Sequence, residues 1–476
     1  MVNLLQDLRH SVRLLRRTPG FTAVAVLVLG LGIGANTAVF SIVNALLLKP
    51  MPGRVSELIG VFNKDRAKPD GYRGFSYPAY QDLRDQNDVF EGLMAHTFSL
   101  VGVREGDSTR RTFAAVVSSN YFTTLGVPLA AGRTFTADEE RPGAAIPVAI
   151  ASDGFWRHSG ADPKLVGSTI TVNSTAVTIV GIAPPGFTGT MAIASPDLWF
   201  PLGVYDQMVI DIFKQPGQGI ADRQSDALII AGRLKPGLSM AAAEPQLDQI
   251  AVRLAQAYPS TDRDRAFTLA HLQRLGTSTN PASKDPLPAV SGMLLLMAAL
   301  VLFVACLNLA NLMLARSAAR RKEMAIRLAL GGSRARLIRQ LLTEGFVLSI
   351  AGGIAGLAIA WWSTSLLATS LANVFPISIV IDSVPDARVF AAAGGFAILS
   401  TIFFALGPAF AATRTALVPD LKADTRDARG GSRMVSGPVL VIVQLAVSLA
   451  LVTAGGLFVR GALNIADTET GNIVRS

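Results

Sequence analysis

The chain has 476 residues; half of them are hydrophobic, 16% are charged, and the formal net charge is +9. This composition excludes an ordinary soluble domain for the whole chain, because apolar runs of about 20 residues are what a helix needs to cross a bilayer. The positive charge does not indicate a nucleic-acid partner, because Lys and Arg cluster beside the apolar runs. The single cysteine, Cys306, lies in one such run and is expected to be a packed apolar side chain.

Residues 2–17 predict an amphipathic helix at the start of the chain. Apolar residues recur there at spacings of three and four, and the arginines occupy other faces. A basic amphipathic helix beside a span lies at the membrane interface, where its arginines meet headgroups, so membrane lipid is an expected partner. A docking role is the alternative. Pro19-Gly20 is expected to break the helix before the first span.

Five apolar segments are long enough to cross a bilayer and contain no Lys, Arg, Asp or Glu. They are Phe21–Leu48, Pro286–Ala315, Phe346–Leu367, Val389–Thr413 and Met434–Val459. A charge at the centre of a spanning helix costs about 3 kcal/mol on insertion scales, so this absence is a strong signal. The loop over residues 366–387 has no Lys or Arg, whereas the other flanks are basic. The positive-inside rule therefore predicts a cytoplasmic N-terminus.

Residues 53–285, between the first two spans, have the composition of a soluble domain. The expected elements are a β hairpin over Ile170–Val180 with its turn at Asn173-Ser174, strands over Ala144–Ala151 and Ala227–Leu234, and helices over Tyr77–Gln86 and Met240–Ala257. These elements predict a mixed α+β domain. Since one span precedes it, the domain is expected to lie outside the cytoplasm.

No constellation typical of catalysis, cofactor binding or metal binding occurs in the sequence. There is no G-x-x-x-x-G-K loop and no G-x-S-x-G elbow, and the four histidines are far apart. The G-x-G pattern at Gly30, Gly32 and Gly34 lies in an apolar span and indicates helix packing. The acidic cluster 138–140, beside Thr136, is expected to cap a helix start and to be solvated.

The connector between the second and third spans, Arg316–Gly345, is the most informative segment. It reads RSAARRKEMAIRLALGGSRARLIRQLLTEG and contains eight Lys or Arg and two acids. Gly331-Gly332 is expected to end one helix, and Ser333 to cap a second one that leads into the third span. A short helix of this kind fits a cleft on a cytoplasmic protein; the alternative is that the charges only fix topology. Glu344 is expected to be interfacial or paired with an arginine.

The chain resembles the MacB/FtsX-like ABC transporter permease family, and within it the duplicated MacB-like group called ADOP. The resemblance rests on DLRHSVRLLRRTPGFTAVAVLVLGLGIGANTAVFSIVNALLLKP near the N-terminus, VVSSNYFTTLGVPLAAGRTF, VGSTITVNSTAVTIVGIAPPGF and RRKEMAIRLALGGSRARLIRQLLTEG. It implies an α-helical membrane protein of about five transmembrane helices, with a large α+β extracytoplasmic domain of MacB periplasmic-core type.

The organisation that we expect from spans and resemblance together runs along the whole chain. It comprises a cytoplasmic amphipathic helix (1–20), a first transmembrane helix with a stalk (21–52), a periplasmic MacB-like core domain (53–285), a second transmembrane helix (286–315), a cytoplasmic coupling segment (316–345), a third helix (346–367), a short periplasmic loop (368–387), a fourth helix (388–413), a cytoplasmic linker (414–433), a fifth helix (434–460) and a periplasmic stub (461–476).

The resemblance implies a permease subunit of a type VII ABC transporter in the bacterial inner membrane. Such a subunit couples ATP hydrolysis by a separate cytoplasmic ABC ATPase to movement of the periplasmic domain, for export or extraction of a substrate. The residues implied to contact the ATPase are Glu323, Met324, Ile326, Arg327 and Leu330. Further implied partners are a second copy or a second permease half, and a periplasmic adaptor.

Two expectations qualify this assignment. An FtsX-like regulator of an envelope hydrolase is the alternative function, and binding of a hydrolase rather than a substrate-stimulated ATPase would distinguish it. Residues 437–465 resemble the first span of a second repeat, which implies either a fragment or a gene truncated after that span.

Overall fold

The computed structural model divides the chain into a helix-bundle unit and a soluble unit. The bundle unit comprises Met1–Asn44, Ala289–Leu366 and Asp382–Ser476, and the soluble unit comprises Ala45–Pro288 and Leu367–Ile381. The structure describes residues 2–68, 71–192, 194–209, 219–272, 274, 279–281, 287–319, 326, 334–374, 378–379, 386–413, 441–457 and 460.

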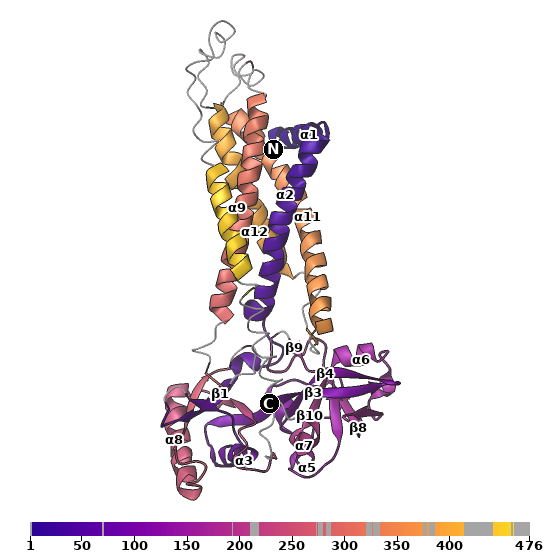
Figure 1. Ribbon diagram of the computed structural model, residues 1–476, viewed down its shortest axis with the longest axis vertical. Helices are drawn as coiled ribbons and strands as arrows, with labels where there is room; N and C mark the ends of the chain where they lie inside the picture. Colours follow the sequence, from indigo (N-terminus) through magenta and orange to yellow (C-terminus); the bar gives the residue numbers. More distant parts are fainter. Residues whose placement is uncertain are drawn as a thin grey trace. The chain divides into compact units, whose positions relative to one another are not determined.

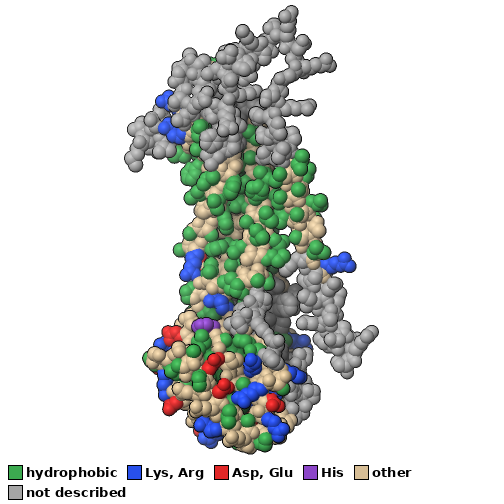
Figure 2. Space-filling view, turned by 90° about the vertical axis from the view of Figure 1, so that its left-hand side faces the viewer, with side chains coloured by type: hydrophobic (Ala, Val, Ile, Leu, Met, Phe, Trp, Pro, Cys, Tyr) green, Lys and Arg blue, Asp and Glu red, His purple; other side chains and the backbone are tan. Residues whose placement is uncertain are grey.

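Long apolar helices form the bundle unit (Figure 1). Its helices are α1 (Val2–Arg16), α2 (Pro19–Val43), α9 (Leu287–Ala319), α11 (Arg334–Val374), α12 (Ala387–Thr413) and a shorter apolar helix over Val441–Leu457. Within the described residues, four helices are long and apolar enough to cross a membrane. On the face drawn in Figure 2, hydrophobic side chains make up much of the surface of these helices, which is the surface that a lipid environment requires.

Helix bounds differ from the predicted spans at the connector. The predicted second connector helix does lead into the third span, because α11 begins at Arg334 and continues through Phe346 as one helix. Arg, Leu and Gln favour helix, and no proline lies between Arg334 and Phe346, so the apolar pattern marks only the membrane-spanning part of a longer helix. The predicted break at Pro19-Gly20 lies at Thr18 instead, because proline is favoured in the first turn, where no N–H bond is needed.

Glycines bring α2 and α11 into close contact. A Cβ added at Gly356 would lie 3.0 Å from the backbone nitrogen of Gly34 and 3.2 Å from the carbonyl oxygen of Gly30. A Cβ at Gly352 would lie only 2.5 Å from Cβ of Leu29. In lipid, small residues of this kind let two helix backbones approach. The prediction that the Gly30–Gly34 pattern serves helix packing is confirmed.

Buried polar side chains tie α2 to its other neighbours. Asn36 donates from Nδ2 to the carbonyl oxygen of Ala298 in α9, at 2.7 Å. Asn44 donates to Oδ2 of Asp386, at the start of α12, at 2.8 Å. Cys306 is 2% exposed and packs in the bundle core, as predicted. The first spanning helix and its C-terminal Asn44 are therefore hydrogen-bonded to α9 and to the start of α12, and the helix packs closely on α11.

The soluble unit is α+β, and its elements follow in chain order. They are η1 (Asn44–Leu48, which begins in the bundle unit), η2 (Val55–Glu57), β1 (Ile59–Asp65), β2 (Tyr72–Arg73), α3 (Tyr77–Gln86), β3 (Phe90–Glu105), β4 (Ser108–Val117), α4 (Tyr121–Thr124), β5 (Ala131–Gly132), α5 (Ala137–Glu140), β6 (Val148–Ala151), α6 (Asp153–His158), η3 (Pro163–Leu165), β7 (Thr169–Val172), β8 (Thr175–Ile182), β9 (Ala194–Ser195), β10 (Leu198–Pro201), η4 (Leu202–Val204), α7 (Tyr205–Met208), β11 (Ile229–Leu234), α8 (Met240–Ala257), β12 (Arg265–His271) and β13 (Ser378–Ile379).

One long sheet organises this unit, in the order β12-β1-β11-β3-β4-β10-β6-β8-β5, with β2 on β1 and β7 between β3 and β8. The pairs β4–β10 and β6–β8 are parallel, and the other pairs are antiparallel. Successive residues of β4 alternate between two apolar cores, Ala114 and Val116 in one and Ala115 and Val117 in the other. Because successive side chains point to opposite faces, both faces of the central strands are covered. The helices α3 and α8 cover the face that carries Ala114 and Val116.

Most of the predicted elements of this unit are confirmed. The helices α3 and α8 have the predicted bounds, and β7 and β8 form the predicted hairpin. Its turn residues Asn173 and Ser174 have φ of 46° and 65°, the left-handed conformation of a tight hairpin turn. The strand predicted over 144–151 was too long: β6 begins at Val148, because Ala145 has φ of 48° and Pro147 has no N–H to donate.

The acidic cluster 138–140 is only partly as predicted. Thr136 does cap α5, because Thr136 Oγ1 accepts from the Glu139 N–H and the Thr136 N–H donates to Glu139 Oε2. However, Glu139 and Glu140 are 4% and 2% exposed, so the prediction that the cluster is solvated is wrong for both. Glu139 forms an ion pair with Arg133, 2.7 Å away, which compensates its burial.

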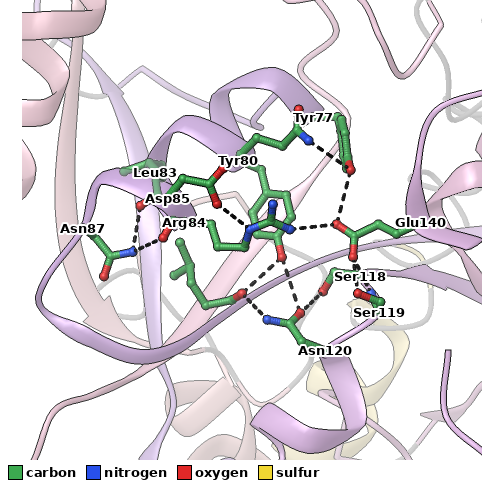
Figure 3. A network of polar contacts seen from close by, with 12 residues as sticks. Tyr77, Tyr80, Leu83, Arg84, Asp85, Asn87, Ser118, Ser119, Asn120 and Glu140 are labelled. Atoms are coloured by element: carbon green, nitrogen blue, oxygen red, sulfur yellow. Dashed lines mark hydrogen bonds and ion pairs between the residues drawn. The ribbon is translucent and has the colours of Figure 1, made fainter. Parts of the chain in front are cut away.

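Glu140 is the centre of the polar network in Figure 3. Its carboxylate accepts from the Ser119 N–H at 2.8 Å, from Arg84 at 3.2 Å and from the Tyr77 hydroxyl at 3.4 Å. Burial and the neighbouring Glu140 charge raise the pKa of Tyr77, so the phenol stays protonated and can donate. The network joins α3, α5 and the end of β4.

We expect Glu139→Gln to lower the stability of the soluble unit by about 1 kcal/mol at neutral pH, and the loss to vanish in acid. Burial alone would raise the pKa of Glu139, but the hydrogen bonds from Arg133 and Thr136 and the Arg133 charge outweigh it, so the pKa lies below its ordinary value of 4.5. The stability that this carboxylate contributes is therefore fully present above pH 4.5 and is lost as the pH falls through the lower folded-state pKa.

Urea unfolding of the full chain in detergent measures this effect. The four tryptophans divide between the units, so Trp361→Phe and Trp362→Phe leave Trp156 and Trp199 as fluorescent reporters of the soluble unit. In this reporter background, the stability deficit of the Gln variant at neutral pH should disappear in acid, as the pH falls through the folded-state pKa of Glu139. A deficit of the same size at both pH values would show that the carboxylate charge does not stabilise the fold.

Candidate coupling site at the basic end of the helix bundle

The predicted partner-binding residues lie in the connector between α9 and α11. Among them, Ile326 is helical and 60% exposed, which suits an apolar contact with another protein. Glu323, Met324, Arg327 and Leu330 lie outside the described residues, as do Gly331, Gly332 and Ser333. The site is therefore built from the two arms that flank the connector, the end of α9 and the start of α11.

Arg316, in the last turn of α9, contacts the junction of α1 and α2. Its Nη2 donates to Thr18 Oγ1 at 2.9 Å, and its guanidinium lies 4.3 Å from the centre of the Phe21 ring. A guanidinium over an aromatic face is attracted by the negative ring face, by about 0.5–2 kcal/mol depending on solvation. Arg316 therefore joins the end of α9 to the start of α2.

Arg339, in the second turn of α11, forms an ion pair with Asp7 of α1. Its Nε lies 2.7 Å from Asp7 Oδ2, and the side chains are 41% and 21% exposed. An ion pair this exposed stabilises the fold by about 1 kcal/mol at most, so its main effect is to orient α1 relative to α11. Sequence reasoning missed this pair, although one signal was available: Asp7 is the only acid before Glu57.

Glu344 lies one turn further along α11. It is 2% exposed, and Gln340 Nε2 donates to its Oε1 at 3.4 Å. The carboxyl group therefore lies inside the bundle, and its position at the membrane interface or its pairing with an arginine stays a prediction. Thr343 is also buried, and its hydroxyl donates back to the Arg339 carbonyl at 2.8 Å.

Both arms of the connector thus contact the α1–α2 elbow. A displacement of the connector would act on α2 through Arg316 and on α1 through Arg339. The chain of α2 continues through the π-helical turn η1 toward the soluble unit without a break. Among the described residues, no group of three or more His, Cys, Asp or Glu side chains could hold a metal ion. Side-chain contacts thus anchor both arms of the connector to the same elbow.

These features define a multi-pass membrane protein of the permease type, with a large soluble domain inserted after its first spanning helix. The model of the MacB-like periplasmic core domain matches residues 22–250, and the model of the FtsX-like permease C-terminal region matches residues 295–417. The second match covers most of α9, the connector, α11 and α12. The chain belongs to the MacB/FtsX-like permease family.

The chain is similar to proteins named as export permeases. It is 24% identical over 245 residues to the probable export ATP-binding/permease protein MacB of Pseudomonas entomophila, covering 52% of this chain and 33% of the relative. It is 25% identical over 267 residues to the macrolide export ATP-binding/permease protein MacB of Sodalis glossinidius, covering 55% and 37%. The matched region thus spans about a third of the length of these curated relatives.

A solved structure also matches the chain. It is the periplasmic region of MacB from Actinobacillus actinomycetemcomitans, at 15% identity and a TM-score of 0.34, and the match covers 47% of this chain and 92% of that one.

Proposed function

We propose that this chain is the permease subunit of a type VII ABC transporter in the bacterial inner membrane. A separate cytoplasmic ABC ATPase would bind the connector through Glu323, Met324, Ile326, Arg327 and Leu330 and displace it. The spans would carry this displacement to the periplasmic domain, which would export or extract a substrate on the outer side.

The observation that carries the proposal is the attachment of both connector arms to the α1–α2 elbow. A connector that served only to fix topology would need no bonds from Arg316 to Thr18 and from Arg339 to Asp7. The family assignment adds support, because the relatives are named as ATP-binding and permease proteins. The orientation rests on the positive-inside rule, which places the basic connector in the cytoplasm.

Co-purification of the full chain with candidate ABC ATPases tests the proposal. Glu323→Ala and Arg327→Ala are each expected to weaken the complex about thirtyfold, the loss of roughly 2 kcal/mol that is typical of a central interface residue. Arg253→Ala, an exposed arginine of α8, is the matched control and should leave the complex unchanged. Binding at wild-type strength by both connector variants would contradict the assignment of the connector.

A further inference from the structure

The helix α1 is fixed in one rotation about its own axis. Ser11 and Leu15 are 0% and 5% exposed, and Leu15 packs in the bundle core. Asp7, on the same side, is held by Arg339. Because the inward side of α1 is fixed by these contacts, its outward side is defined as well.

The outward side of α1 is basic. Arg9, Arg13 and Arg16 are spaced by four and three residues, so they form one row opposite the buried residues. All three are exposed, and none of their guanidinium groups is bonded to another residue that the structure describes. Two flanking basic residues are exposed too: His10 and Arg17. The one acid of the helix is already paired with Arg339.

The place of this row relative to the apolar span favours lipid as its ligand. Figure 1 shows α1 lying across the end of α2, whose helix begins at Pro19. Arg16 lies three residues before the start of this apolar helix, where the headgroups of a surrounding bilayer are expected. Val12, beside the row, is 39% exposed and can enter the boundary between headgroups and acyl chains. A surface for a soluble protein would require neither the apolar residue nor this depth.

We propose that the outward face of α1 binds the headgroups of anionic phospholipids, with Arg9, Arg13 and Arg16 as the main contacts. Guanidinium groups match phosphate oxygens with paired hydrogen bonds, and a net negative headgroup adds charge attraction that a zwitterionic one lacks. Each basic residue near an anionic surface strengthens binding about fivefold. The inference goes beyond the proposed function and is independent of it, because no ATPase takes part.

Native mass spectrometry of the purified full chain in detergent tests this proposal. The chain is titrated with phosphatidylglycerol or with phosphatidylcholine of the same acyl chains. The wild type should retain phosphatidylglycerol preferentially, and the triple variant Arg9→Gln, Arg13→Gln, Arg16→Gln should reduce that preference about tenfold or more. The triple Arg→Lys variant should keep most of the preference, because it preserves the charge. This result would also show that the helix tolerates substitution at the three positions.

The matched control replaces three exposed arginines of the soluble unit: Arg104→Gln, Arg111→Gln and Arg253→Gln. It changes the net charge by as much as the triple Gln variant of α1 and should leave lipid retention unchanged. Equal retention of both lipids by the wild type, or unchanged retention by the α1 triple Gln variant, would overturn the proposal. Displacement of the lipid by millimolar inorganic phosphate would indicate a small-anion site instead.

Discussion

Replacing Asp262 by alanine is expected to lower the free energy of unfolding of the soluble unit by about 3–5 kcal/mol. Asp262 is 1% exposed and lies between two arginines, 3.1 Å from Arg223 Nη1 and 2.9 Å from Arg265 Nε. Removing one partner of a buried ion pair leaves the other charge uncompensated, and the desolvation cost of that charge is then no longer offset.

The neighbouring Arg265 is the reason for the large effect. It is 3% exposed, and burial lowers the pKa of its guanidinium despite the two nearby carboxylates. Its contact with Asp262 Oδ1 is an ion pair without hydrogen-bond geometry, and its Nη1 has no hydrogen-bond partner among the described residues. After loss of Asp262, the remaining acid within reach is Asp226, at 3.3 Å, whose pKa is itself raised by burial.

Urea unfolding in the Trp361→Phe, Trp362→Phe background measures the loss, with Asp138→Ala as control. The ion pair of Asp138 with Arg141 has both side chains 73% exposed, so the control should change stability by about 0.5 kcal/mol or less. If the single variant does not fold, Asp262→Ala combined with Arg265→Met should recover much of the loss by removing both buried charges. A double variant less stable than the single one would contradict this explanation.

Local signals made the helices of the soluble unit predictable. Ser76 and Ser239 cap α3 and α8 by accepting from the N–H three residues ahead, and Pro78 lies in the first turn of α3. Both bounds follow from residues that are close in sequence. The strand predicted over 144–151 failed for an equally local reason. The left-handed conformation of Ala145 is a backbone state that composition does not reveal.

Long-range pairing made the rest unpredictable. The burial of Glu140 depends on Arg84, 56 residues away, and the burial decides whether the acidic cluster is a solvated cap or a structural network. The contact between Asp7 and Arg339 joins residues 332 apart. Periodicity locates spans and faces, but it does not say which faces meet. The site residues of the connector remain predictions.

The second large effect is expected in the bundle, where Gly356→Leu should force α2 and α11 apart. A Cβ at this position would meet backbone atoms, the Gly34 nitrogen at 3.0 Å and the Gly30 oxygen at 3.2 Å, and backbone cannot move aside as a flexible side chain can. A leucine adds three further carbons to that contact, so the cost should be at the upper end of the 1–3 kcal/mol typical of overpacking.

Cys306 is a built-in reporter of this separation, since it is the only cysteine and is 2% exposed in the bundle core. Maleimide labelling of the purified chain in detergent should be at least about tenfold faster in Gly356→Leu, because a loss of 1.4 kcal/mol raises the open population tenfold. Gly394→Leu, whose added Cβ would have nothing within 4 Å, should label at the wild-type rate. Urea unfolding of the soluble unit should be unchanged in both. If Gly356→Leu also labelled at the wild-type rate, close packing of α2 on α11 would not hold the bundle together, and α2 could not be the helix that carries connector movement outward.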